Sequence, residues 1–291
     1  EGAWRRNLAS WEDRFRKAMQ FRMSDGFVVT VNQFPASHLT TPLKSFKSHR
    51  PRRKQRARYV DTSSDSGDTG VTVWDASLVL SFLLCKHPEL VEGKRVLELG
   101  SGTGLLGVIC GRLGAESVLM TDLSRSEGKG GLQAECPVAA RMREAVIRNC
   151  PGRDVRFAPL EWGTEDAERV LHEHLEGRAP DVILCADLIY DTTAVEPLLD
   201  TLRRLMGPET RVVLAQDAHI PEALEEFAAL SPQVLEDRGL GVPNPDEVLS
   251  LCPEMLISQY TLRAPSGDGS VDGSVDGSVH GSGYGSGYGS G

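Results

Sequence analysis

Apolar and polar residues follow two periods along the chain, and these periods assign most segments to helices or strands. Near the start, apolar residues recur every three or four positions over 5–20, which predicts a helix. The run FVVTV at 27–31 predicts a strand. Residues 35–70 have no such period and are polar, then basic, then rich in Ser, Asp and Gly. We therefore expect an N-terminal helix and strand over 1–34 and a flexible loop over 35–70.

From residue 71 onward, short apolar runs alternate with amphipathic stretches. The apolar runs predict six strands, at 95–99, 117–121, 155–160, 181–186, 211–215 and 255–262. The stretches between them predict helices at 74–85, 105–112, 138–149, 193–206 and 223–230, with a further charged helical piece before 181. Residues 124–137, rich in Gly, Ser and charge, predict a loop. This alternation is typical of an α/β domain with a mainly parallel sheet and helices on both faces, which we place at 71–264.

Composition and charge narrow the class of protein. The 291 residues are 40% hydrophobic and 25% charged, which is typical of a globular domain, and no apolar run is long enough to cross a bilayer. The net charge of −9 argues against a general nucleic-acid binder. Residues 44–58 are nevertheless strongly basic, either as a solvated loop or as a segment that attracts an acidic partner or an import receptor. The Ser/Gly repeats over 265–291 predict a disordered tail.

The six cysteines indicate a reducing compartment. None forms a C-x-x-C pair, and no His/Cys spacing suggests zinc, so no metal is implied. The first residues lack the apolar core of a secretory signal. We expect a monomer in the cytoplasm or the nucleus, without a membrane partner.

The stretch 94–122, KRVLELGSGTGLLGVICGRLGAESVLMTD, carries the strongest functional signal. It predicts a strand, a turn with Gly100, Gly102 and Gly104, a helix and a second strand that ends at Asp122. This is the first half of a nucleotide-binding α/β unit. Asp122 stands where a carboxylate binds ribose hydroxyls, although it could instead cap a following helix.

Glu98 bears on which nucleotide this unit binds. The letters GTGLLG at 102–107 match the G-x-G-x-x-G motif of dinucleotide-binding proteins, but alone that motif is weak. Glu98 puts a carboxylate at the end of the first strand, where its charge would repel a pyrophosphate. S-Adenosylmethionine has a ribose, an adenine and a positive centre but no phosphate, so it would not meet this repulsion. Glu98 therefore favours S-adenosylmethionine over NAD or FAD.

Five motifs in order make the chain resemble a known family. They are VTVWDAS (71–77), VLELGSGTGLLG (96–107), TD (121–122), LEWG (160–163) and ADLIYD (186–191). Together they resemble the family-16 group of class I methyltransferases, the seven-β-strand protein-lysine methyltransferases. The resemblance covers roughly residues 71–215. It implies a Rossmann-like seven-stranded fold, S-adenosylmethionine as cofactor and a lysine side chain of a protein as acceptor.

The resemblance also implies which residues contact the cofactor. Trp74 would lie over its methionine end, Asp122 would bind the ribose hydroxyls and Trp162 would flank the adenine. Both tryptophans could instead be core residues. The complete cofactor set implied by the resemblance is Trp74, Glu98, Gly100, Ser101, Gly102, Asp122, Trp162 and Ala186.

The D-L-I-Y element at 187–190 would hold the acceptor. By the resemblance, Asp187 binds the lysine ammonium and Tyr190 walls the channel; otherwise Asp187 caps the next helix and Tyr190 packs in the core. Asp191 is interpreted as a surface or capping residue. DLIY stands where methyltransferases that act on nucleobase amines carry an N-P-P-Y element, which weakens a nucleic-acid acceptor. A small-molecule or nucleic-acid methyltransferase, or a non-catalytic cofactor-binding module, remain the alternatives.

Overall fold

The computed structural model describes residues 18–33, 72–123, 137–218, 220–240 and 255–264. In chain order its elements are β1 (Ala18–Arg22), β2 (Val28–Asn32), α1 (Asp75–Lys86), η4 (Pro88–Leu90), β3 (Arg95–Leu99), α2 (Leu105–Arg112), β4 (Ser117–Asp122), α3 (Pro137–Asn149), β5 (Val155–Pro159), α4 (Asp166–His174), β6 (Val182–Ala186), α5 (Thr192–Leu205), β7 (Arg211–Asp217), α6 (Pro221–Leu230), η5 (Ser231–Gln233), β8 (Leu235–Asp237) and β9 (Met255–Leu262).

Seven strands form one sheet in the order β5-β4-β3-β6-β7-β9-β8. The five strands from β5 to β7 are parallel to their neighbours, whereas β9 runs antiparallel to both β7 and β8. This confirms the predicted Rossmann-like, seven-stranded and mainly parallel sheet.

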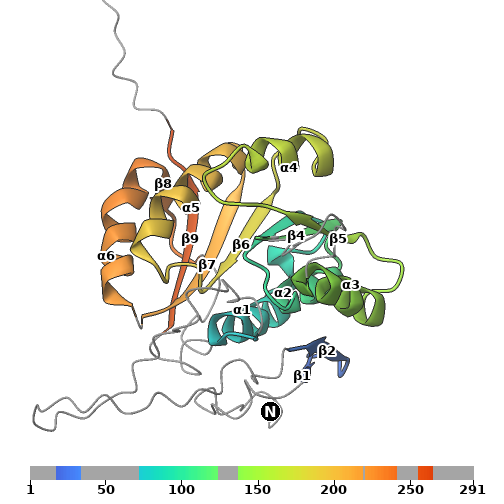
Figure 1. Ribbon diagram of the computed structural model, residues 1–291. Helices are drawn as coiled ribbons and strands as arrows, with labels where there is room; N and C mark the ends of the chain where they lie inside the picture. The colour runs from blue at the N-terminus through green and yellow to red at the C-terminus, as the bar shows by residue number, and fades with distance from the viewer. Residues whose placement is uncertain (1–17, 34–71, 124–136, 219, 241–254, 265–291) are drawn as a thin grey trace, which may run out of the picture.

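The central strands are buried on both faces, and alternate residues enter two separate cores. On β3, Val96 belongs to the core beneath α1, α2 and α3, while Leu97 and Leu99 belong to the core beneath α4, α5 and α6. Figure 1 shows these two helical layers on opposite sides of the sheet. Because helices cover both faces, the strands read as continuous apolar runs, as in other parallel sheets.

The order of the strands determines where a ligand can bind. The chain runs outward from β3 to β4 and β5 and then returns, so that β6 pairs with β3 on its other side. In an open α/β sheet, ligands bind at such a reversal point, at the carboxyl ends of the strands. Apart from Trp74, the residues that the sequence singled out lie at the carboxyl ends of β3, β4 and β6 or in the segments that follow β3, β5 and β6.

The predicted helix over 5–20 is wrong at its carboxyl end, because Ala18–Arg22 is a strand. Met19 and Phe21 alternate with exposed residues and pack into the core, and β1 pairs with β2 in an antiparallel hairpin. Helical spacing puts Met19 on an apolar face, but an alternating strand buries it equally well, so pairing with β2 decides the outcome. The strand β8 was not predicted, because its three residues are too short for a periodic pattern.

Several predicted regions lie outside the described residues: residues 5–17 of the N-terminal helix, the loop 35–70 with its basic segment, residues 124–136 and the tail 265–291. The four cysteines that the structure describes are free thiols, and Cys110 and Cys185 are buried, as expected for small apolar side chains. Among the described helices, none has the length and the apolar character to cross a membrane.

Candidate functional site

The glycine turn between β3 and α2 has the conformation that its residues predict. Gly100, Gly102 and Gly104 have φ angles of 60°, 52° and 76°, in the left-handed region that other residues rarely adopt. Ser101 ties the turn to β4, because its N–H donates to the carbonyl of Thr121 at 2.9 Å and its Oγ accepts from the N–H of Thr121 at 3.1 Å. The turn is therefore fixed by backbone geometry and by the neighbouring strand.

Glu98 lies beneath this turn and is only 3% exposed. Its Oε2 accepts a hydrogen bond of 2.9 Å from the N–H of Gly107, in the first turn of α2. Burial raises the pKa of Glu98 to about 8, although hydrogen bonds from Ser101 and Gly107 act in the opposite direction. At neutral pH the carboxyl group is thus largely protonated.

The case against a dinucleotide therefore changes in its physical basis. Charge repulsion by Glu98, which the sequence suggested, is weak if the carboxyl group is protonated. The hydrogen bond from the N–H of Gly107 to Glu98 disfavours a dinucleotide in another way. That N–H is one of the donors with which a helix N-terminus binds a phosphate, and Glu98 occupies it. The structure leaves one donor fewer for a pyrophosphate.

Asp122 ends β4 directly beside the glycine turn. Its Oδ2 accepts from the N–H of Gly102 at 2.7 Å, and its Oδ1 accepts from the N–H of Leu123 at 2.7 Å. Burial raises the pKa of Asp122, while these two N–H groups partly offset that effect. The carboxylate is fixed in direction at the end of the strand, as required of a group that is to bind ribose hydroxyls.

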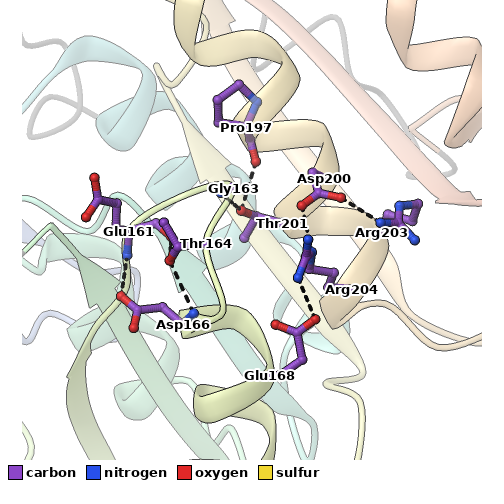
Figure 2. A network of polar contacts seen from close by, with 10 residues as sticks. All are labelled: Glu161, Gly163, Thr164, Asp166, Glu168, Pro197, Asp200, Thr201, Arg203 and Arg204. Carbon is purple, nitrogen blue, oxygen red and sulfur yellow. Dashed lines mark hydrogen bonds and ion pairs between the residues drawn. The ribbon is translucent and has the colours of Figure 1, made fainter.

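Trp162 sits on the loop between β5 and α4, and a polar network holds this loop against α5 (Figure 2). The N–H of Gly163 donates to Oγ1 of Thr201 at 2.9 Å, and that hydroxyl donates to the carbonyl of Pro197 at 2.8 Å. Gly163 has a φ of 73°, and a Cβ atom there would lie 3.0 Å from Pro197. The half-buried indole packs against the core of the α4–α6 face, so the structure is compatible both with core packing and with a cofactor contact.

Asp187 follows β6 and has a strained backbone, with a φ of 60°. Its N–H donates to the carbonyl of Ala215, and its Oδ1 accepts from Nε2 of Gln216 at 2.9 Å. The cap of α5 is Asp191, whose side chain accepts from the N–H of Thr193. The alternative role of Asp187 as a helix cap is therefore excluded, and the interpretation of Asp191 as a capping residue is confirmed.

The remaining predicted residues lie at strand or helix ends. Tyr190 is 37% exposed, which excludes core packing for its ring. Ala186 ends β6 and pairs with Ala215 of β7. Trp74 is half-buried at the N-terminal end of α1, a helix that packs against β6 and β7.

Gly100 brings the two halves of the site together. A Cβ atom built on it would lie 2.5 Å from Cδ2 of Leu188 and 3.6 Å from Cζ2 of Trp162. Leu188 belongs to the D-L-I-Y element, so the glycine turn, the D-L-I-Y element and the Trp162 loop meet at Gly100. A side chain at position 100 would have to displace Leu188, and the φ of 60° also favours glycine.

Two residues of this region were not singled out from the sequence. Gln216, which is fully buried, bonds to the D-L-I-Y element, and Thr201, also fully buried, bonds to the Trp162 loop. For Gln216 a signal existed, because a polar residue follows the apolar run RVVLA at the carboxyl end of a strand. For Thr201 the amphipathic pattern of α5 gave none.

Comparison with known proteins identifies several relatives of this chain. Protein-lysine N-methyltransferase EFM3 of Chaetomium thermophilum is 33% identical over 177 residues, covering 57% of this chain and 48% of that protein. EEF1A lysine methyltransferase 3 of Mus musculus is 32% identical over 157 residues, covering 53% and 59%. Protein-lysine N-methyltransferase EEF2KMT of Homo sapiens is 28% identical over 179 residues, covering 58% and 48%. The chain thus spans about half the length of the relatives it matches.

The sequence model of a family described as lysine methyltransferase matches residues 59–230, which is more than half of the chain. This range contains the glycine turn, the Trp162 loop and the D-L-I-Y element. The chain therefore belongs to the lysine methyltransferase family.

Proposed function

We propose that this protein is an S-adenosylmethionine-dependent protein-lysine N-methyltransferase. The contact of Leu188 with Gly100 carries the proposal. It holds the D-L-I-Y element, which we call the acceptor segment, against the glycine turn, which we call the cofactor turn. A methyl transfer needs donor and acceptor side by side, and the pairing of β3 with β6 places their binding segments on neighbouring strands.

The residues of the turn fit S-adenosylmethionine. Asp122 binds the ribose hydroxyls with a carboxylate held by the N–H of Gly102. Glu98 takes up the N–H of Gly107, which suits a nucleoside without phosphate. Trp162 would flank the adenine and Trp74 the methionine end, while Gly100, Ser101, Gly102 and Ala186 would line the site with backbone and small side chains.

Asp187 and Tyr190 bind the lysine side chain. A carboxylate attracts the ammonium form through a charge-assisted hydrogen bond and orients it. The free amine is the nucleophile, and the ordinary pKa of lysine is near 10.4, so the ammonium must lose a proton to solvent before it reacts. Partial desolvation and a nearby positive charge both lower that pKa.

When bound, the cofactor supplies an electrophilic methyl group on a sulfonium centre. The protein would contribute alignment: the glycine turn would hold the cofactor, and Asp187 and Tyr190 would hold the amine beside it. Alignment of this kind removes a large part of the barrier of a bimolecular reaction.

A labelling experiment tests the proposal. Purified protein is incubated with methyl-tritiated S-adenosylmethionine and an extract of cells that lack it, and the label is followed in proteins, nucleic acids and small molecules. We expect label in protein, recovered as methyl-lysine after hydrolysis. Label confined to nucleic acid or small molecules would contradict the lysine acceptor, and cofactor binding without any transfer would support a non-catalytic module.

Asp187→Asn is the matched test of the acceptor site. Asparagine tolerates a positive φ, and its side-chain oxygen can still accept the bond from Gln216, so this bond is kept while the charge is lost. Loss of a charged hydrogen bond of about 1.5–3 kcal/mol predicts a fall in rate of about 10–100-fold. Asp191→Asn is the control, because it removes the same charge four residues away and asparagine also caps helices. Equal effects of both variants would remove the specific role of Asp187.

A further inference from the structure

The buried side-chain amide of Gln216 makes three hydrogen bonds to the acceptor segment. This residue lies near the carboxyl end of β7, one position beyond the pairing of Ala215 with Ala186. Its side chain has no exposure to solvent. A buried amide is costly unless its donors and its acceptor are all bonded, so its partners show what it holds in place.

All the partners lie on the acceptor segment or next to Gln216 itself. Its Oε1 accepts from the N–H of Ile189 at 2.8 Å. Its Nε2 donates to Oδ1 of Asp187 at 2.9 Å, to the carbonyl of Ile189 at 3.2 Å and to the carbonyl of Asp217 at 3.1 Å. The amide therefore spans the turn from Asp187 to Ile189.

The orientation of this amide is determined by its surroundings. A flipped side chain would place Oε1 against three oxygen atoms and Nε2 against the N–H of Ile189, which would replace attraction with repulsion. Glutamine is also neutral at every ordinary pH, so it can orient the carboxylate of Asp187 without competing for its proton. A carboxylate at position 216 would have no N–H to donate to Asp187, and it would compete with Asp187 for a proton.

The backbone of the segment needs such a restraint. The φ of Asp187 is 60°, and a residue with a side chain pays about 1–3 kcal/mol for this conformation. Such strain persists where neighbouring groups enforce it. Gln216 does so by bonding the side chain of Asp187 and both backbone groups of Ile189, two residues further on.

We propose that Gln216 is the positioning residue of the acceptor site, which holds the Asp187–Ile189 turn and the direction of the Asp187 carboxylate. This proposal rests on the proposed function for the identity of the acceptor. Gln216 acts through Asp187 and makes no contact with the glycine turn among the bonds described, so its loss should impair transfer while cofactor binding persists.

Two substitutions of similar volume separate positioning from space filling. Gln216→Met removes every hydrogen bond of the amide, and Gln216→Glu keeps the acceptor for Ile189 but turns the donor into an oxygen that faces Asp187. Gln259→Met is the matched control, because Gln259 is buried on β9 of the same sheet, where it pairs with Val213. Circular dichroism and thermal unfolding first establish which variants are folded.

The decisive comparison is between turnover and cofactor affinity. We expect kcat, measured as label transferred to extract protein, to fall by about tenfold or more in both Gln216 variants, because misplacement of a reacting group by about 1 Å has effects of this size. The Kd for S-adenosylhomocysteine, measured by calorimetry, should change much less than kcat, because Leu188 is the only residue of this turn that packs against Gly100 among the contacts described. An unchanged kcat would overturn the proposal, as would a fall in kcat with an equal loss of cofactor affinity.

Hydrogen exchange gives a measurement that is independent of methyl transfer. The amide of Ile189 should exchange faster in Gln216→Met than in the wild type and stay protected in Gln259→Met. Protection of Ile189 in Gln216→Met would overturn the proposed restraint, whatever the reaction is. If the wild type transfers no label to lysine, the proposed function fails, while the exchange of Ile189 still decides whether Gln216 holds the turn.

Discussion

Burial of Glu98 predicts a specific dependence of stability on pH. In the unfolded chain its pKa returns to the ordinary 4.5, whereas burial raises it to about 8 in the folded protein. Between these values the folded state holds a proton that the unfolded state has released, so a rise in pH favours unfolding. The contribution of Glu98 to the free energy of unfolding is fully present below pH 4.5. It declines as the pH rises and becomes constant above about pH 8.

The substitution Glu98→Gln isolates this effect. Its amide is neutral at every pH, and its carbonyl oxygen can still accept from the N–H of Gly107. The difference between a pKa of 4.5 and one of about 8 corresponds to about 5 kcal/mol over the whole range. Between about pH 5.5 and pH 7.5 the stability of the variant should therefore rise by about 3 kcal/mol relative to the wild type.

Urea unfolding without cofactor, followed by circular dichroism across this pH range, measures the difference. Glu116→Gln serves as the control for the loss of one carboxylate, because it removes the same charge from an exposed residue beside β4. Parallel curves for the wild type and Glu98→Gln would refute the reasoning, since they would show that Glu98 ionises equally in the folded and the unfolded states.

Three further substitutions test packing and hydrogen bonds. Gly107→Ala should lower stability by about 1–3 kcal/mol, because its Cβ would lie 2.5 Å from Sδ of Met120. Asn149→Leu should cost about 2–3 kcal/mol in urea unfolding, because buried Asn149 bonds both the N–H and the carbonyl of Thr30 and so ties α3 to the N-terminal hairpin. Thr201→Val should weaken S-adenosylhomocysteine binding by about tenfold in calorimetry, because it releases the Trp162 loop at an energy of about 1 kcal/mol or more.

Each of these predictions has a result that would contradict it. A Gly107→Ala protein as stable as the wild type would mean that Met120 moves away at no cost; a shorter residue at 120 should relieve the loss. Unchanged stability of Asn149→Leu would show that the hairpin does not depend on this bridge. Thr201→Ser keeps the hydroxyl and should bind like the wild type, so equal losses in the serine and valine variants would argue against the bond to Gly163.

The sequence predicted best what is encoded within a few neighbouring residues. The runs at 95–99 and 255–262 became strands with the predicted bounds, and the helix at 105–112 did likewise. These segments have uniform apolar patterns and clear breaks at their ends. The carboxyl end of the predicted N-terminal helix failed because Met19 fits either period, and only its partner strand β2 decides between them.

The site was predictable where a residue's role depends on its own strand, and not where it depends on packing between elements. Asp122 and Asp187 could be placed at strand ends, but nothing local showed that Asp187 bonds to Gln216, 29 residues away. The hydrogen-bond partner of Glu98 was also not predictable from the sequence. The direction of α2 relative to β3 determines that the N–H of Gly107 lies against the carboxyl group of Glu98. Three-dimensional packing, rather than period, supplies these contacts.

The pairing of β3 with β6 has a consequence for how the protein reaches its native state. Glu98 pairs with Leu184, and the 85 intervening residues include two complete strands and their helices. Closing so long a segment costs chain entropy before any contact compensates for it, and parallel pairings of this kind form slowly. The nascent chain can complete the glycine turn early, but the D-L-I-Y element reaches its place only when β6 docks. Binding competence should therefore appear late and in one step, as a property of the assembled sheet.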